Sequence, residues 1–225
     1  MALLIAAVAD IHCPKYLDFF KNAFRDIQVP DLLLLAGDIV LRNDYTQLSN
    51  LIPVIREQYK NKIIACFGNE EYDDSIEEYR KFKDITWLND ESIVLNVKGK
   101  RLGIVGSRGA LDRPTFWQRA YIRKIGQIYK QRIDKINSLL ASLDADTKIV
   151  ISHYAPTYGT LIGEHKAIWP EMASRRLELV IERTQPDFWL HGHVHRGMVS
   201  KVNLGNTIVM NVSLPSTKKI SLIEL

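Results

Sequence analysis

The chain has 225 residues, of which 46% are hydrophobic and 25% charged, and these proportions are typical of a soluble globular protein. No apolar run approaches the roughly 18 residues that a membrane-spanning helix needs, so we expect no membrane contact. The net charge of +4 suits an anionic substrate, but a solvated surface with a slight excess of Lys and Arg explains it as well. Two cysteines, Cys13 and Cys66, form no disulfide framework, and we therefore expect a cytoplasmic protein.

The first third of the chain alternates between apolar runs and amphipathic segments. The apolar runs that we predict as strands are residues 3–9, 32–36 and 63–67. The first run ends in Ala7, Val8 and Ala9, which mimics a signal-peptidase site. It is short and has no basic start, so a buried parallel strand explains it better.

Helices are predicted between these strands, at residues 16–27, 48–59 and 75–82. Pro53 fits best near the first turn of the second helix, because proline lacks the N–H group that a helix interior uses. Ser75 is the expected N-cap of the third helix, with Glu78 as its capping-box partner. The resulting β-α-β-α-β-α order predicts a parallel sheet with right-handed crossovers.

Two hairpins and a last strand are predicted in the second half of the chain. Residues 93–97 and 102–105 flank one turn, residues 198–202 and 207–212 flank another, and residues 219–225 form the last strand. Parallel units followed by antiparallel hairpins indicate an α/β fold with two mixed sheets stacked face to face. Because we find no repeat and no linker, residues 1–225 are predicted to form a single domain.

Residues 114–143 are predicted to form one long amphipathic helix. Apolar side chains recur at steps of three or four: Ile122, Ile125, Tyr129, Ile133, Ile136, Leu140 and Leu143. The other faces and the preceding turn are basic: Arg113, Arg119, Arg123, Lys124, Lys130, Arg132 and Lys135. Such a helix could face RNA or phosphate, but charge runs are usually solvated surface, and we favour that interpretation.

Five strand ends are followed by His, Asp or Asn residues. These residues are Asp10, His12, Asp38, Asn69, His153, His193 and His195. Side chains that follow several strands of an α/β sheet converge at its C-terminal edge, so we expect them to meet. Oxygen and nitrogen ligands of this kind suit Mn, Fe, Zn or Ni and argue against a thiolate-bound structural zinc.

Two features of the sequence indicate how these residues are arranged. Asp38 is the natural bridge between two metal ions, because its strand should lie between the strands that carry Asp10 and Asn69. His193 and His195 alternate, so on an extended stretch both imidazoles would point the same way and reach two neighbouring ions.

The motifs Asp10-x-His12, Gly37-Asp38, Gly68-Asn69, His153 and Gly192-His193-x-His195 resemble, in order and spacing, the signature of the calcineurin-like metallophosphoesterases. This resemblance extends from residue 10 to residue 195 and implies a four-layer α/β/β/α sandwich of two mixed sheets flanked by helices. It also implies a dinuclear centre. One metal would take Asp10, His12, Asp38 and His195, and the other would take Asp38, Asn69, His153 and His193.

The chain departs from that signature at Glu70, where the family usually has a histidine that contacts the substrate and is thought to help protonate the leaving group. Three interpretations of Glu70 are open. It could be an ionised group that excludes dianionic monoesters and admits singly charged diesters, since nearby metal ions lower a carboxyl pKa. It could be a protonated general acid. It could also turn away, with Glu71, towards solvent or an arginine.

Three further residues are weaker candidates. Arg108 follows a predicted strand and could clamp a phosphate, although a surface loop arginine is an equal alternative. His165 lies in a loop, and a lone loop histidine is usually neither a lid residue nor a proton donor. His191 is expected to orient a ligand or line the sheet rather than bind metal.

The sequence therefore predicts a hydrolase of phosphate esters that uses two divalent metal ions, with Mn the first choice for assay. The residues expected to act in catalysis are Asp38, Asn69, Glu70 and Arg108. Glu70 favours phosphodiesters over monoesters, and the expected partner is a small phosphate ester. A nuclease acting on RNA or DNA and a non-catalytic scaffold of the same fold are the alternatives. Every expected ligand position carries a residue that can bind metal, which argues against the scaffold. Nucleic acid is not the favoured partner.

Overall fold

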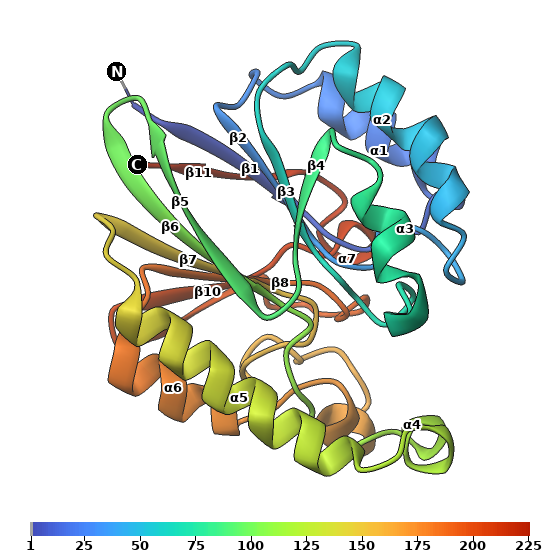
Figure 1. The fold of residues 1–225 in the computed structure, drawn as a ribbon, viewed down its shortest axis with the longest axis vertical. Coiled ribbons are helices and arrows are strands. Elements are labelled where there is room, and N and C mark those ends of the chain that lie inside the picture. Colours follow the sequence, from blue (N-terminus) through green and yellow to red (C-terminus); the bar gives the residue numbers. More distant parts are fainter. Residues whose placement is uncertain (1) are drawn as a thin grey trace.

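Two β-sheets lie face to face at the centre of the computed structural model, which describes residues 2–225 (Figure 1). The first sheet has the strand order β11-β1-β2-β3-β4. Its strands are β1 (Leu4–Val8), β2 (Leu32–Ala36), β3 (Ile63–Cys66), β4 (Ile85–Leu88) and β11 (Ser221–Glu224). Strands β1 to β4 are parallel, as the alternating pattern predicts, and β11 adds an antiparallel edge beside β1.

The second sheet has the strand order β5-β6-β7-β8-β10-β9. Its strands are β5 (Glu91–Val97), β6 (Lys100–Ser107), β7 (Thr147–Ser152), β8 (Phe188–His191), β9 (Lys201–Leu204) and β10 (Thr207–Asn211). The four central strands are mutually parallel, and the edge strands β5 and β9 pair antiparallel with β6 and β10. Both predicted hairpins are therefore confirmed. In the first, Lys98 and Gly99 both have positive φ, as a two-residue turn of the I′ kind requires.

Helices cover the outer face of each sheet. On the first sheet these are α1 (Leu17–Arg25), α2 (Leu48–Arg56) and α3 (Ile76–Arg80), and on the second α5 (Ile125–Ser142) and α6 (Arg176–Thr184). Strand β1 shows why its run is apolar throughout: Ala6 and Val8 face the helices, whereas Ile5 and Ala7 face the other sheet. The fold is thus the expected α/β/β/α sandwich.

Five short helical segments complete the structure: η1 (Tyr45–Gln47), η2 (Asp73–Ser75), η3 (Lys166–Glu171), α4 (Phe116–Tyr121) and α7 (Leu214–Thr217). Across residues 2–225, none of the helices combines the length and the apolar character that crossing a bilayer requires.

Two predictions about helix ends were wrong. Ser75 is the N-cap residue of α3, but its side chain makes no capping bond; it accepts from Asn43 Nδ2 and donates to Asp74. Glu78 pairs with Lys81 instead of closing a capping box. Pro53 lies inside α2 rather than in its first turn. At Ser75, the hydrogen bond from Asn43 of a neighbouring segment replaces the expected cap.

The prediction of a single helix over residues 114–143 was also wrong. The chain forms α4 and then α5, separated by a break in which Lys124 has φ +60. The apolar spacing continues across the break, so periodicity alone could not reveal it. Arg132, assigned to the solvated face, is buried and donates to Asp90 Oδ2 and the carbonyl of Gly109. An arginine satisfied by these acceptors can lie inside, because its charge is paired.

Candidate metal centre

All seven predicted ligands come together where the C-terminal ends of the two sheets meet. Asp10 and His12 follow β1, Asp38 follows β2 and Asn69 follows β3. The remaining three come from the second sheet: His153 follows β7, and His193 and His195 follow β8. The order β1-β2-β3 places Asp38 between Asp10 and Asn69, as predicted.

The first group of ligand atoms surrounds Asp10. One nitrogen or oxygen atom from each of Asp10, His12 and His195 lies within 4.8 Å of the others. His195 Nε2 is 3.1 Å from Asp10 Oδ1, and His12 Nε2 is 3.8 Å from the same oxygen. His12 Nε2 is also 3.8 Å from Asp38 Oδ2, which links this group to the next.

The second group surrounds His153. Its Nε2 lies 3.3 Å from Asp38 Oδ2, 3.0 Å from Asn69 Oδ1 and 3.2 Å from His193 Nδ1. One oxygen of Asp38 therefore approaches a histidine of each group. This is the position that a bridging carboxylate would take between two cations.

The hydrogen bonds of these residues test whether they suit a metal. Asp10 Oδ1, both ring nitrogens of His12 and His195 Nε2 are buried without a hydrogen-bond partner. A buried polar atom left unsatisfied costs roughly 1–3 kcal/mol, so four of them at one point need an explanation. A divalent cation bound by Asp10 Oδ1, His195 Nε2 and one ring nitrogen of His12 would satisfy three of these atoms. The donor set therefore fits the metal that the sequence predicts.

Backbone conformation at the ligands is unusual. Asp10, His12, Asp38 and His193 all have positive φ, between +43° and +67°. Non-glycine residues rarely adopt this region, and such strain persists at functional sites when the surrounding structure holds it. Backbone hydrogen bonds hold it here: Asp10 N donates to Gly37 O and His12 N to Asp38 O.

The prediction of an extended stretch at His193 and His195 was wrong. Strand β8 ends at His191, and Val194 N donates to Gly192 O across a tight turn. The chain turns at His193, so alternation along a strand does not explain how the two imidazoles reach different ligand groups.

Glu71 has a role that the sequence analysis missed. It is fully buried, and each of its carboxylate oxygens accepts two backbone N–H groups. Oε2 accepts from Asp38 and Gly68 at 2.9 and 2.6 Å, and Oε1 accepts from Ile39 and Val40 at 2.6 and 3.2 Å. The expectation that Glu71 turns to solvent or an arginine is therefore corrected. Glu71 fixes the loop that carries Asp38.

Glycine at position 68 belongs to the same arrangement. A Cβ atom there would overlap Asp38 Oδ1 and the backbone nitrogen of Asp38. Only glycine lets β3 end this close to the loop after β2, which is the physical reason for the Gly68-Asn69 motif.

Glu70 turns its carboxylate towards a neighbouring backbone segment. Oε2 accepts from Arg42 N at 2.6 Å, while the backbone nitrogen of Glu70 donates to Asp38 Oδ1 at 2.8 Å. The side chain is half-buried at the edge of a cavity that also includes Asn69 and His193. This contact holds the Glu70 carboxyl at the cavity edge, beside Arg42, rather than against the ligand atoms.

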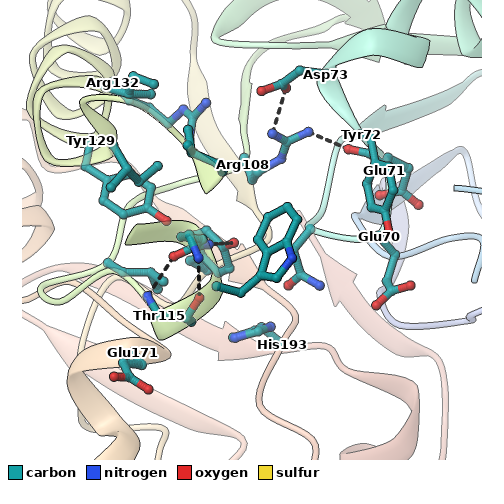
Figure 2. Close-up of a pocket in the computed structure, with 18 of the residues that line it drawn as sticks. Glu70, Glu71, Tyr72, Asp73, Arg108, Thr115, Tyr129, Arg132, Glu171 and His193 are labelled. Carbon is teal, nitrogen blue, oxygen red and sulfur yellow. Dashed lines mark hydrogen bonds and ion pairs between the residues drawn. The ribbon is translucent and has the colours of Figure 1, made fainter. Parts of the chain in front are cut away.

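Arg108 lies in the wall of the same cavity rather than on the open surface (Figure 2). Its side chain is 11% exposed and donates to Asp73 Oδ1 at 2.7 Å and to Glu71 O at 2.6 Å. Its Nε atom is buried without a partner. The guanidinium is thus held in one orientation in the cavity wall.

The other two histidines lie outside the ligand groups. His191 is fully buried and bonds to Thr160 Oγ1 at 2.9 Å and to Gly192 O at 2.9 Å. Burial lowers the pKa of His191 to about 4, so it is neutral and orients the loop of His193. His165 is exposed and is not part of the cavity wall.

The charge states of the ligands follow from burial and from one another. Burial alone would lower the pKa of His153, but the adjacent Asp38 carboxylate outweighs it and raises that pKa to about 9. Burial lowers the pKa of His193 to about 3, and the neighbouring His153 adds to this effect. In the metal-free protein, one histidine of the second group is therefore charged and the other neutral.

Metal binding should consequently release a proton from His153. Below pH 9 we expect the apparent metal affinity to fall by about tenfold for each pH unit. The raised pKa of His153 also stabilises the metal-free fold; that contribution is complete below the ordinary value of 6.5 and is lost as the pH rises through about 9. Competition with a metal-sensitive dye at several pH values would measure the change in affinity, and calorimetry in two buffers would measure the proton release. An affinity independent of pH between 6 and ~8 would contradict this assignment.

Comparisons with known proteins agree with this geometry. A family model described as calcineurin-like phosphoesterase matches residues 3–197. Among solved structures, the phosphopantetheinyl hydrolase PptH of Mycobacterium tuberculosis has 14% identity and a TM-score of 0.67, over 94% of this chain and 89% of that one. The protein TT1561 of Thermus thermophilus has 16% identity and a TM-score of 0.63, over 99% of each chain.

A third similar structure is GAP50, described as the anchor in the inner membrane complex of Plasmodium. It has 12% identity and a TM-score of 0.63, over 100% of this chain and 81% of that one. No protein of the curated set matches the chain. The structural likenesses show the fold, and the family model covers every candidate ligand. The chain therefore belongs to the calcineurin-like phosphoesterase family and is a metal-dependent phosphoesterase.

Proposed function

We propose that this protein hydrolyses small phosphodiesters in preference to monoesters, at a centre of two divalent metal ions that the seven residues named above hold. The observation that carries this proposal is the position of Asp38. One of its oxygens lies 3.8 Å from His12 Nε2 and 3.3 Å from His153 Nε2, between the two ligand groups. Because the ligands come from both sheets, we also propose that residues 1–225 act as a single domain.

When bound, the two ions would supply an activated water and offset the negative charge of the phosphoryl group. The residues of the chain would orient them and the substrate. Asp38 would bind both cations, and Asn69 would complete the second ligand group beside His153. Arg108, held by Asp73, would hold a phosphate oxygen at the cavity wall. Mn is the first metal to test, since oxygen and imidazole ligands suit it.

The preference for diesters rests on Glu70. The family has an imidazole at this position, which can donate a proton, whereas Glu70 brings a carboxylate whose hydrogen bond comes from a backbone N–H. An ionised carboxylate has no proton to donate, and its negative charge at the cavity edge disfavours a second charge on the substrate. A singly charged diester meets less repulsion than a dianionic monoester.

Two other functions remain as alternatives. A nuclease would need a basic surface for the strand, but Arg132 of the basic segment is buried and paired with Asp90. A scaffold without activity is the role suggested by the description of GAP50 as an anchor. All seven ligand positions of this chain carry residues that can bind metal, which favours the enzyme.

The decisive experiment is turnover of paired chromogenic esters by protein loaded with Mn, Zn, Fe or Ni. We expect hydrolysis of a nitrophenyl diester to exceed that of nitrophenyl phosphate, and metal analysis to find two ions per chain. Weak binding to an oligonucleotide with little salt dependence would argue further against the nuclease, because salt dependence grows with the number of phosphates that a protein contacts. If no divalent metal supports turnover of either ester, the enzyme assignment fails.

Glu70→His tests the reason for the diester preference. The substitution removes a negative charge and installs a proton donor, which contributes typically 10²–10⁴-fold when it is well positioned. We expect kcat/KM to rise more for monoesters than for diesters, and more for alkyl than for aryl esters. Glu70→Gln is the matched control, because it removes the charge without adding an acid. A ratio of monoester to diester turnover that stays unchanged in both variants would exclude a role for the Glu70 charge.

A further inference from the structure

A cavity of about 660 Å³ opens beside the second ligand group, with Asn69 and His193 in its wall. In Figure 2, His193 lies at one side of this cavity, Arg108 and Tyr129 lie opposite, and Glu70 lies at the edge. Small-molecule sites usually enclose roughly 300–1,000 Å³, so the space is large enough for more than a phosphate. A simple alkyl ester would leave most of it empty.

One wall of the cavity is apolar and comes mostly from residues 114–143, which the apolar spacing predicted as a single helix. Its apolar residues are Leu111, Trp117, Ile122, Ile125, Ile128 and Tyr129. The break at Lys124 lets α4 and α5 both line the cavity, and Figure 1 shows α4 beyond the N-terminal end of α5. Trp117 is 56% exposed, which leaves one of the largest aromatic side chains uncovered beside the metal centre.

The charged residues of the wall restrict what can enter. Both arginines are already paired, Arg108 with Asp73 and Arg132 with Asp90. The carboxylates of Glu70 and Asp74 line the same cavity, as does Glu171, whose charge is offset by Arg113 at 3.0 Å. The mouth is therefore acidic, and a group with further negative charge, such as the next phosphate of a polynucleotide, would be repelled.

We propose that this cavity binds the organic group of the substrate, and that this group is a single uncharged ring system, aryl or heteroaryl, stacked on Trp117. This proposal rests on the proposed function in one respect: the phosphoryl group of the substrate lies in the metal centre. The apolar wall and the acidic mouth carry the rest. The substrate class is then a compact aromatic phosphodiester rather than a nucleic-acid strand or a sugar phosphate.

Calorimetric binding of phosphinates to the Mn-loaded protein tests this without turnover, because their C–P bonds are not hydrolysed and they carry one charge, as a diester does. Dimethylphosphinate and methylphenylphosphinate differ only in the ring. We expect the phenyl compound to bind about tenfold more tightly or better, given the apolar area that a ring buries. A carboxylate on the ring should weaken binding. A phosphinate carrying an adenine group separates a nucleobase from a simple aryl group, and tight binding of either supports the proposal.

Trp117→Ala should reduce the preference for the phenyl compound to about threefold or less, while dimethylphosphinate binds as before. Phe116→Ala is the matched control, because Phe116 is a neighbouring aromatic residue that is 78% exposed and outside the cavity wall. Both side chains are largely exposed, so neither substitution threatens the fold. Metal-dependent binding of both phosphinates with equal affinity would overturn the aromatic-group proposal alone. Absence of any metal-dependent binding, together with no ester turnover, would overturn the proposed function as well.

Discussion

Asp38→Asn should lower kcat/KM by roughly 10³-fold or more and release at least one metal ion, while the fold survives. Even residues that only support a ligand typically contribute 10–100-fold in metal affinity or activity, and Asp38 lies between both ligand groups. An amide of the same shape loses the shared negative charge that offsets repulsion between two cations. Its oxygen can still accept the N–H of Glu70, which now bonds to Asp38 Oδ1 at 2.8 Å, so the loop keeps that contact.

Metal analysis, turnover and circular dichroism of this variant would be measured together. The variant has a second expected result. The Asp38 carboxylate raises the pKa of His153 to about 9 in the metal-free protein, so this pKa should fall when Asn replaces Asp38. Asp112→Asn is the matched control, because Asp112 binds Ser174 and Tyr158 outside the ligand groups. Two full equivalents of metal with normal turnover in Asp38→Asn would refute the bridging role.

Glu71→Gln should destabilise the protein and weaken metal binding. The Glu71 side chain contacts the backbone N–H of the ligand Asp38, not a ligand atom. Four backbone N–H groups point at the carboxylate, and an amide nitrogen in place of one oxygen would face two of them donor to donor. Leaving buried donors unsatisfied costs roughly 1–3 kcal/mol each, so we expect a loss of about 2–4 kcal/mol in the free energy of unfolding. For a chain of this size that lowers Tm by about 5–15 °C.

The measurement is best made at pH 8, because burial and the adjacent Asp38 raise the pKa of Glu71 to about 7 and the carboxyl is ionised above it. Glu70→Gln is the control for this variant: it makes the same chemical change one residue earlier, where a single backbone N–H is at stake. Equal stability of the two glutamine variants would show that the four-bond arrangement does not hold the loop.

The strands and the ligand residues could be predicted from the sequence for a direct reason. Strands buried on both faces must be apolar throughout, so runs such as β2 are visible without any tertiary information. Asp10, Asp38 and His153 then stand out, because ionisable residues at the ends of such runs are buried and need a common partner. The order of the runs also indicated the parallel sheet and the central position of β2.

What the sequence could not reveal depends on backbone conformation and on contacts between distant residues. The positive φ of Lys124, which breaks the expected long helix, leaves the apolar spacing unchanged and so is invisible to periodicity. Arg132 and Asp90 are 42 residues apart, and only their meeting offsets the free-energy cost of burying that arginine.

The sequence by itself determined the fold class, the seven candidate ligands and the kind of chemistry they support, because these follow from residue types and their periodic spacing. Only the tertiary structure decided how the site is held and what it can admit. Glu71 became the support of the Asp38 loop because its carboxylate meets four backbone N–H groups from two different segments. Trp117 came to line a cavity beside His193 because α4 turns away from α5. Both depend on distances between segments, which no local pattern encodes.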